Sequence, residues 1–455
     1  MIGPTPRKTG LLLLAVAALI VPALTRGAAD GPRLVGDPSA SGQPLADFAA
    51  RRAALRKAAG NGMVLLIGGP AGEEGKFRPE SNLFYLTGVS APSAALAIVP
   101  PDDPLNANAA LYLPPTGGAA TRFGEAYLSP GPDAVAATGI DPVHRLWDMW
   151  DELTPSIRKA PRVYILGPVG EAARYTHAGR TIDRIRAINP DAEILDVGRL
   201  IAPMRLRKSA AELDAIRAAG AATIEGMEGA ARSIRPGATE LAVEGEILAG
   251  FRRKGAAREG FPCIVGSGPN ATVLHHTSSE RAMAAGELVV VDIGAEVRCF
   301  SGDVTRTFPV GGKFTPRQRQ VYDLVLAVQK AASEAVVPGK TTLGDLNALA
   351  RRLFRESPLR ARADDGTERT MDTFFAHSIS HWLGMDVHDV GSMAATLEPG
   401  MVLTIEPGLY IPGEGIGIRI EDDFAVTDRG AEKLTPGLPS DAAGIEKLMR
   451  SKRTR

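Results

Sequence analysis

The hydrophobic pattern is clearest between Gly286 and Pro309, where two apolar runs rich in β-branched residues flank a short polar segment. The first run ends in Asp292 and the second opens with Asp303. This pattern predicts an antiparallel hairpin, which brings the two acids close together. A carboxylate at the end of an apolar strand is costly to bury unless it is solvated, paired or bound to a metal. We therefore expect cations between the two acids.

The same pattern returns further along the chain. Segment 400–406 repeats segment 286–292, with an acid six positions after a glycine in both, and Glu421 opens a return strand as Asp303 does. Two diverged copies offset by roughly a hundred residues explain this self-similarity. A pseudo-twofold arrangement would deliver two acids from each copy to one site. Four carboxylates carry four negative charges, which two divalent ions would balance.

Helical periodicity precedes each acid hairpin. The stretch Ser209-Ala-Ala-Glu212 is a capping box ahead of a long amphipathic pattern. The stretch Thr315-Pro-Arg-Gln318 opens the corresponding helix of the second copy, with proline at its first position. Pro-Gly turns at Pro236 and Pro338 then each separate two helical stretches. The matching helix starts support the repeat.

The N-terminal half alternates helical and strand-like patterns, which predicts a smaller α/β domain. It contains no phosphate loop and no dinucleotide fingerprint, so we expect a supporting or oligomerising role. The predicted helices are Leu45–Ala59, Val143–Ile157 and Ala172–Ile188, and the predicted strands are Met63–Ile67, Leu83–Thr87, Ala94–Val99, Leu111–Leu113, Val163–Leu166 and Glu193–Val197.

The N-terminus has the layout of a secretory signal peptide. Arg7 and Lys8 precede an apolar run from Leu11 to Leu24, and small residues follow at 27–29. The run is short for a membrane span, which makes an uncleaved anchor the weaker alternative. We expect a secreted or periplasmic protein with no stable membrane anchor. The predicted division is signal peptide 1–29, linker 30–44, N-terminal α/β domain 45–203, catalytic domain 204–447 and basic tail 448–455.

Charge and cysteine content narrow the function further. The 455 residues include 52 basic and 52 acidic side chains, so no net charge attracts nucleic acid or an anionic membrane. Cys263 and Cys299 are the two cysteines, which excludes a disulfide framework. Cys299 lies between two candidate ligand acids, but hard divalent ions prefer oxygen. We interpret it as a buried thiol.

Five of the seven histidines lie between positions 275 and 388, beside the acid-bearing strands. A single histidine is usually an ordinary core or surface residue, but this crowding favours a functional site. His377 and His381 are four residues apart and share one face of either a strand or a helix. The residue pattern alone leaves open which histidine binds metal. The five are His275, His276, His377, His381 and His388.

These residues lie in motifs that resemble the Xaa-Pro aminopeptidase (aminopeptidase P) family, within the methionine aminopeptidase and prolidase superfamily. The resemblance implies an α+β fold: a pita-bread catalytic domain with a pseudo-twofold repeat, preceded by a smaller α/β domain. The N-terminal half resembles the family's accessory domain through the twelve residues from Phe77 to Gly88. The catalytic motifs lie at Ile264–Asn270, Leu274-His275, Asp292–Gly294, Ser301–Phe308, His377–Asp389, Leu397–Tyr410 and Gly417–Asp422.

The resemblance implies a site for two divalent metal ions. Asp303 and Glu421 would bridge both ions, and Asp292 would complete the shell of one. His381 and Glu406 would complete the other. Ligation by oxygen with one imidazole suits manganese best, with cobalt, iron and zinc as alternatives.

The resemblance also implies residues on the substrate side. His275, His377 and His388 would orient the peptide and stabilise the tetrahedral intermediate. Glu406 would shuttle a proton in addition to its role as a ligand, and Arg419 would hold the hydrogen-bond network around the ligands. Two neighbours fall outside the family pattern. His276 is interpreted as an ordinary loop histidine, and Ser378 replaces the commoner glycine.

The expected activity is release of the N-terminal residue from peptides whose second residue is proline. A prolidase acting on Xaa-Pro dipeptides would use the same metal constellation and stays open as the alternative. A methionine aminopeptidase fits poorly with a secretory signal and a large N-terminal domain. A non-catalytic binding protein of this fold fits poorly with an intact ligand set. We expect a homo-oligomer, either a dimer or a tetramer.

Overall fold

The structure is a computed structural model that describes residues 37–70, 77–115 and 127–450. The predicted signal peptide, linker residues 30–36 and tail residues 451–455 lie outside the described residues. The described part of the predicted linker includes a short 3-10 helix, η1 (Pro38–Ser41), in which two residues are buried. Among the described residues, no helix combines the length and apolar character needed to cross a membrane.

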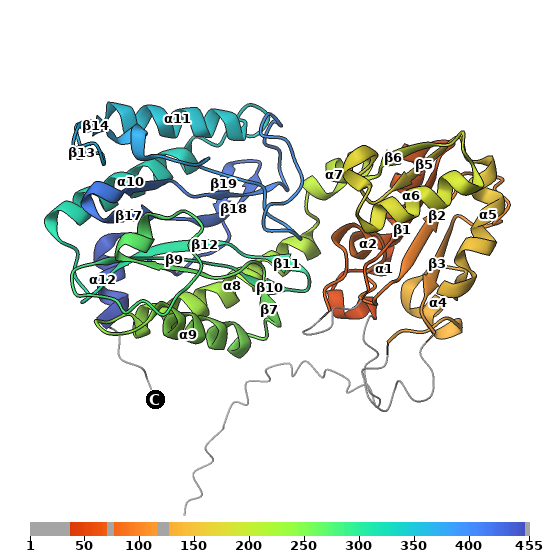
Figure 1. The fold of residues 1–455 in the computed structure, drawn as a ribbon, viewed down its shortest axis with the longest axis horizontal. Coiled ribbons are helices and arrows are strands. Elements are labelled where there is room, and N and C mark those ends of the chain that lie inside the picture. Colours follow the sequence, from red (N-terminus) through yellow and green to blue (C-terminus); the bar gives the residue numbers. More distant parts are fainter. Residues whose placement is uncertain (1–36, 71–76, 116–126, 451–455) are drawn as a thin grey trace, which may run out of the picture. The chain divides into compact units, whose positions relative to one another are not determined.

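The N-terminal domain is built on a six-stranded mixed sheet with the order β4-β3-β2-β1-β5-β6 (Figure 1). Successive β1 residues point to opposite faces, so Val64 packs with α1, α2 and α4 whereas Met63 packs with α5 and α6. Burial on both faces explains why these strands read as continuous apolar runs. The elements are α1 (Leu45–Ala59), β1 (Met63–Ile67), α2 (Ser81–Thr87), β2 (Ala95–Ile98), β3 (Ala109–Leu113), α4 (Pro132–Thr138), β4 (Val143–Arg145), α5 (Met149–Lys159), β5 (Arg162–Ile165), α6 (His177–Ile188), β6 (Glu193–Asp196) and α7 (Gly198–Leu206).

One strand predicted in this domain is wrong. The run Leu83–Thr87 lies in helix α2, which begins where the Glu80 carboxylate accepts a hydrogen bond from Leu83 N at 2.7 Å. The helix ends at Gly88, whose left-handed φ of 68° closes it. Nearly every α2 side chain is buried, so its apolar run lacks the polar face that would have marked it as a helix.

Two predicted helices begin later than expected. The segment predicted as helix from Val143 starts as strand β4 and a 3-10 turn, and α5 begins only at Met149. The segment predicted as helix from Ala172 contains a 3-10 turn, η3 (Gly170–Ala173), before α6. Thr176 caps α6, its hydroxyl accepting from Gly179 N at 3.3 Å.

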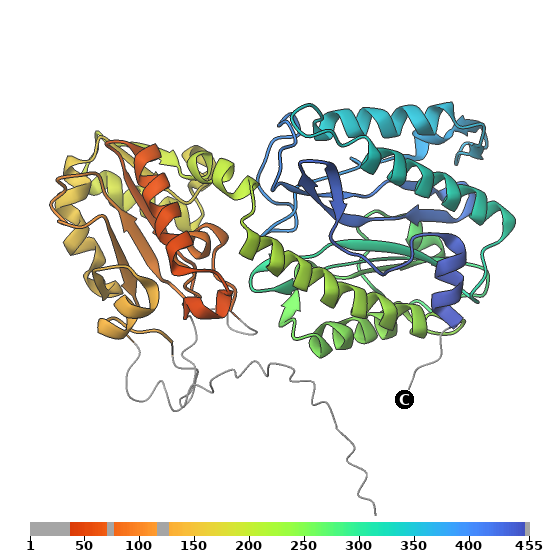
Figure 2. The same ribbon diagram turned by 180° about the vertical axis from the view of Figure 1, so that it is seen from behind.

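The C-terminal domain contains two copies of one unit, as the repeat predicts. Strands β9, β12, β17 and β18 lie between the helix pairs α8–α9 and α10–α11, and the view from behind shows the same layering (Figures 1 and 2). The first copy comprises α8 (Ala210–Ser233), α9 (Glu240–Arg253), β8 (Ile264–Ser267), β9 (Leu288–Ile293) and β12 (Val304–Pro309). The second comprises α10 (Pro316–Glu334), α11 (Leu343–Glu356), β15 (Val402–Ile405) and β18 (Asp422–Thr427). The remaining strands and helix are β7 (Arg258–Glu259), β10 (Ala295–Val297), β11 (Phe300–Ser301), β13 (Arg360–Arg362), β14 (Glu368–Thr370), β16 (Gly408–Ile411), β17 (Ile416–Arg419), β19 (Gly430–Lys433) and α12 (Ala442–Arg450).

Both predicted capping boxes are present. Ser209 Oγ accepts from Glu212 N at 3.3 Å, and Glu212 Oε2 accepts from Ser209 N at 2.8 Å. Thr315 and Gln318 make the equivalent pair at the start of α10. These reciprocal bonds satisfy amides that the helix itself leaves unpaired. The two copies therefore begin their long helices in the same way.

Strand pairing brings the four acids to one end of the two hairpins. β9 and β12 pair antiparallel with Asp292 opposite Thr305, which places Asp303 just before the paired stretch. β15 and β18 pair antiparallel with their last pair at Ile405, so Glu406 and Glu421 flank the same end. The intervening segment 294–303 is more ordered than the predicted polar link, because it forms the second hairpin β10–β11.

Candidate metal centre and active site

A cavity of about 600 Å³ opens at the ends of these hairpins. It is lined by residues from both copies of the repeat, and its wall includes every residue predicted for the site. Apolar side chains, among them Phe261, Leu274 and Met393, form much of the remaining wall, together with polar residues such as His276 and Ser378. The predicted site residues in the lining are His275, Asp292, Asp303, His377, His381, His388, Glu406, Arg419 and Glu421.

Three buried carboxylates in this cavity, those of Asp292, Asp303 and Glu421, each have one oxygen that lacks a hydrogen-bond partner among the described residues. Burial raises the pKa of Asp303, and the neighbouring charges of Glu421 and Asp292 raise it further. Burial likewise raises the pKa of Glu421, with repulsion from Glu406 and Asp292 added. Unpaired buried oxygens that repel one another are the environment in which divalent cations bind.

His381 presents a ligand nitrogen to these acids. Its Nδ1 donates to the carbonyl of Trp382 at 3.0 Å, which leaves the lone pair of Nε2 free. Nε2 lies 3.4 Å from Asp303 Oδ2, 3.5 Å from Glu406 Oε1 and 4.0 Å from Glu421 Oε1. Burial lowers the pKa of His381 to about 4, so the ring is neutral at physiological pH. Asp303, His381 and Glu421 offer ligand atoms that all lie within 4.8 Å of one another.

Glu406 is a buried carboxyl group that lies beside His377 and the other acids. It directly follows β15, and its Oε2 lies 3.6 Å from His377 Nδ1. Burial raises the pKa of Glu406 to about 8, with the charge of Asp292 adding to the shift and Arg419 opposing it. Without bound ions this carboxyl group is therefore mostly protonated at pH 7, and a cation beside it would favour the carboxylate form.

Arg419 is buried and donates hydrogen bonds to residues on three neighbouring segments. Its Nη2 donates to Asp292 Oδ2 at 2.5 Å, its Nη1 to Tyr410 Oη at 2.5 Å and its Nε to Thr305 Oγ1 at 3.1 Å. The hydroxyl of Thr305 in turn donates to Glu421 Oε2 at 2.6 Å. One guanidinium therefore orients two of the candidate ligands, one directly and one through a threonine.

Sequence reasoning missed Thr305 and Tyr410. Thr305 lies two residues after Asp303 in β12, and period-2 spacing could have placed both on one face of the strand. Tyr410 in β16 carries no comparable signal, because its partners lie on β17 and in the segment around His377.

His377 is held as a neutral ring by two neighbours. Its Nδ1 donates to the carbonyl of Ser378 at 2.7 Å, so its Nε2 accepts from Tyr410 Oη at 3.0 Å. Burial, together with the charge of Arg419, lowers the pKa of His377 to about 3. Ser378, which replaces the commoner glycine, donates its hydroxyl to Ser380 O at 3.1 Å. The ring of His377 lines the cavity, so this substitution leaves the histidine at the site.

The other three histidines also line the cavity. His275 and His388 are exposed. The rings of His381 and His388 meet edge-on, with centroids 4.5 Å apart and planes at 79°. His276 differs from its interpretation as an ordinary loop histidine, because it lines the cavity and its Nε2 lies 2.8 Å from Glu240 Oε2.

The two cysteines play no visible part in the acid cluster. Cys263 is buried in the cavity wall, where burial raises its pKa. Cys299 lies in the β10–β11 turn outside the cavity lining, and burial raises its pKa to about 12. Both thiols are free, and Cys299 is half-buried rather than fully buried as interpreted from the sequence.

Comparisons with known proteins agree with this geometry. The model of metallopeptidase family M24 matches residues 214–428, and that of the aminopeptidase P N-terminal domain matches residues 48–164. The Xaa-Pro aminopeptidase of Escherichia coli is 34% identical over 406 residues, which cover 83% of this chain and 90% of the relative. The Xaa-Pro aminopeptidase of Haemophilus influenzae is 34% identical over 391 residues, covering 82% of this chain and 88% of that relative.

Solved structures give the same result. Proline aminopeptidase P II from Yersinia pestis superimposes with a TM-score of 0.80 at 33% identity, covering 90% of this chain and 99% of that one. Aminopeptidase P from E. coli with the inhibitor Pro-Leu superimposes with a TM-score of 0.78 at 32% identity, covering 90% and 98%. The predicted fold and family are confirmed. These relatives are named aminopeptidases rather than dipeptidases, which favours the main prediction over prolidase.

Proposed function

Because the chain belongs to metallopeptidase family M24, we propose that it is an Xaa-Pro aminopeptidase, which hydrolyses the bond between an N-terminal residue and a following proline. The observation that carries the proposal is the convergence of four acids and one imidazole from the two repeats on one cavity. Relatives of that name covering most of the chain support the substrate class.

We assign two divalent ions to the acid cluster. The donor set fits them, because three carboxylates offer unpaired buried oxygens and His381 offers a neutral nitrogen. The ligands would be Asp292, Asp303, His381, Glu406 and Glu421. Such ions polarise a carbonyl and lower the pKa of water, supplying Lewis acid and nucleophile together. The oxygen-rich set favours manganese, with cobalt, iron and zinc as alternatives.

The protein groups around the cluster supply proton transfer and orientation. Glu406 lines the cavity and would accept a proton from the attacking water and deliver it to the proline nitrogen that leaves. His275, His377 and His388 line the cavity and would orient the peptide and stabilise the tetrahedral intermediate. Arg419 would hold Asp292 in place through their 2.5 Å hydrogen bond.

The cavity wall suits a proline at the second position. An Xaa-Pro bond is a tertiary amide without an N–H, so an ordinary peptidase loses one backbone contact to it. A pocket that recognises the ring by apolar contact avoids that loss. Phe261, Ile264, Leu274, Val387 and Met393 supply such surface beside the acids.

Hydrolysis of a matched peptide set tests the proposed function. Metal-loaded protein should release the first residue from Xaa-Pro-Yaa tripeptides and act much more slowly on Xaa-Ala-Yaa. Preference for Xaa-Pro dipeptides over the tripeptides would assign a prolidase instead. Failure to cleave any of these peptides with the site fully loaded would contradict the peptidase proposal.

We also propose that the mature protein is secreted or periplasmic. The charged start, apolar run and small residues at 27–29 support this location. N-terminal sequencing of protein from the exported fraction should begin near residue 30. Recovery of the uncleaved chain from the cell interior would contradict it.

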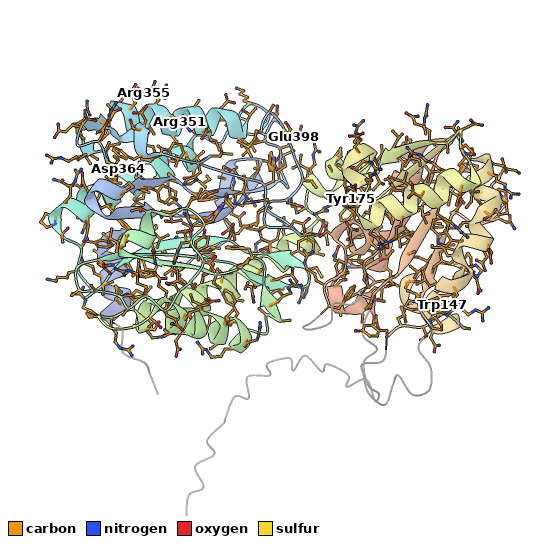
Figure 3. All side chains as sticks on the ribbon, in the orientation of Figure 1. Trp147, Tyr175, Arg351, Arg355, Asp364 and Glu398 are labelled. Atoms are coloured by element: carbon orange, nitrogen blue, oxygen red, sulfur yellow. The ribbon has the colours of Figure 1, made fainter. Side chains whose placement is uncertain are left out.

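A homo-oligomer, dimer or tetramer, is proposed as the working assembly. Two large aromatic side chains on the N-terminal domain support it, because Trp147 is 69% exposed and Tyr175 is 92% exposed (Figure 3). Light scattering coupled to size exclusion should give a multiple of the chain mass. A Trp147→Ser variant that assembles like the parent would exclude that side chain from the contact.

A further inference from the structure

Glu240 is a fully buried carboxylate on which six hydrogen bonds converge. Its Oε1 accepts from Ser267 N at 2.8 Å, Ser267 Oγ at 2.8 Å and Asn270 Nδ2 at 3.0 Å. Its Oε2 accepts from His276 Nε2 at 2.8 Å, Ser279 N at 3.0 Å and Ser279 Oγ at 2.5 Å. Burial alone would raise its pKa, but these bonds outweigh burial and lower the pKa to about 2. Glu240 is therefore a permanent buried anion.

The donors lie on both sides of a loop that forms one wall of the cavity. The loop is residues 271–278. Ser267 and Asn270 precede it, His276 lies within it and Ser279 follows it. One carboxylate at the start of α9 thus ties together the two arms of segment 267–279. Residues 274–277 of this segment line the cavity beside the acid cluster.

The loop carries His275, which is one of the predicted substrate-side histidines. Its side chain is exposed, and within the part of the chain that the structure describes no hydrogen bond or ion pair holds it. The next side chain, that of His276, points the other way along the loop to Glu240. The position of the His275 ring therefore depends on the backbone, which its neighbour anchors.

We propose that Glu240 is a positioning residue of the active site, which acts through His276 and Ser279 to hold the loop bearing His275 against the cavity. Glu240 itself does not touch the substrate. The inference rests on the proposed peptidase function, because it assigns His275 a place beside the bound peptide. It predicts that loosening the loop lowers turnover without removing metal ions, since none of the proposed ligands belongs to the loop.

The matched variants His276→Leu and His276→Gln test this proposal. Leucine removes the donor to Glu240, whereas glutamine places an amide N–H at about the position of Nε2. We expect His276→Leu to lower kcat for an Xaa-Pro-Yaa peptide about 10- to 100-fold with KM changed less than about threefold, because misplacement of roughly 1 Å has effects of that size. We expect His276→Gln to recover most of the loss and both variants to keep the parent's metal content.

Two further variants separate positioning from stability alone. His144→Leu breaks another His–Glu pair, at 3.3 Å to Glu152 in the N-terminal domain, and should leave kcat and KM unchanged. Ser279→Ala removes one hydroxyl from the Glu240 cluster and should show a smaller loss of kcat, which covers the case in which His276→Leu fails to fold. Thermal unfolding of each variant reports its stability separately.

The outcomes are distinct. If folded His276→Leu and Ser279→Ala keep the parent's kcat and KM and lose only thermal stability, Glu240 is a structural residue and the positioning role is wrong. An equal loss of kcat in His276→Leu and His276→Gln would also overturn the positioning role, because the hydrogen bond to Glu240 would then have no effect on turnover. An inactive, metal-loaded parent protein would instead overturn the proposed function.

Discussion

The Thr305→Val substitution isolates one hydroxyl in the support of the candidate metal centre. Thr305 is fully buried, donates to Glu421 Oε2 at 2.6 Å and accepts from Arg419 Nε at 3.1 Å. Valine has nearly the same shape and suits a strand, so the fold should persist. A hydrogen bond to a charged group contributes about 1.5–3 kcal/mol, and each ~1.4 kcal/mol is a factor of ten in affinity. We therefore expect ion affinity to weaken about 10- to 100-fold.

Calorimetric titration of the metal-free protein with manganese measures this change directly. Thr305→Ser restores the hydroxyl and should bind nearly as tightly as the parent. Thr307→Val is a matched control on the same strand face, because Thr307 bonds the backbone of Arg419 and no candidate ligand. It should lower thermal stability and leave ion affinity unchanged. If Thr305→Val binds manganese as the parent does, the hydroxyl does not orient Glu421 and the reasoning fails.

Three further outcomes are expected. Tyr410→Phe removes the hydroxyl that connects the Arg419 guanidinium to the His377 imidazole. We therefore expect kcat/KM to fall about tenfold at unchanged metal content, and an unaffected kcat/KM would contradict this. Because the pKa of Glu406 is about 8 without bound ions, metal binding at pH 7 should release a proton and strengthen as pH rises toward 8. Calorimetry in buffers of different ionisation enthalpy measures that release, and its absence would contradict the assigned ligand. Gly417→Ala should lower stability by about 1–3 kcal/mol in denaturant unfolding, because its Cβ would clash with the carbonyl of Ala271, and an unchanged midpoint would contradict the close packing.

Sequence patterns correctly predicted the features that depend on residues close together in the chain. The capping boxes at Ser209 and Thr315 need partners three residues away, and both are present. The acid hairpins follow from strand alternation, so the gathering of Asp292 and Asp303 could be predicted from the sequence. The strand predicted at 83–87 was wrong, because full burial of a short helix removes the polar face that periodicity detects.

Partners far apart in sequence lay beyond the reach of these patterns. Thr305 and Glu421 are separated by 116 positions, and Glu240 and His276 by 36. No spacing rule connects such pairs, because tertiary folding alone brings them together. For the same reason the residue pattern could not separate His381 from the other histidines, whereas its Nδ1 bond to the Trp382 carbonyl and its facing acids distinguish it in the structure.

Ion titration of turnover tests the central claim most directly. The claim is that acids from the two repeats jointly hold two divalent ions that hydrolyse Xaa-Pro bonds. Metal-free protein should be inactive on an Xaa-Pro-Yaa peptide, and activity should rise with added manganese and saturate at two ions per chain. Asp303→Asn should abolish this response. Turnover by rigorously metal-free protein, or a full response in Asp303→Asn, would contradict the account.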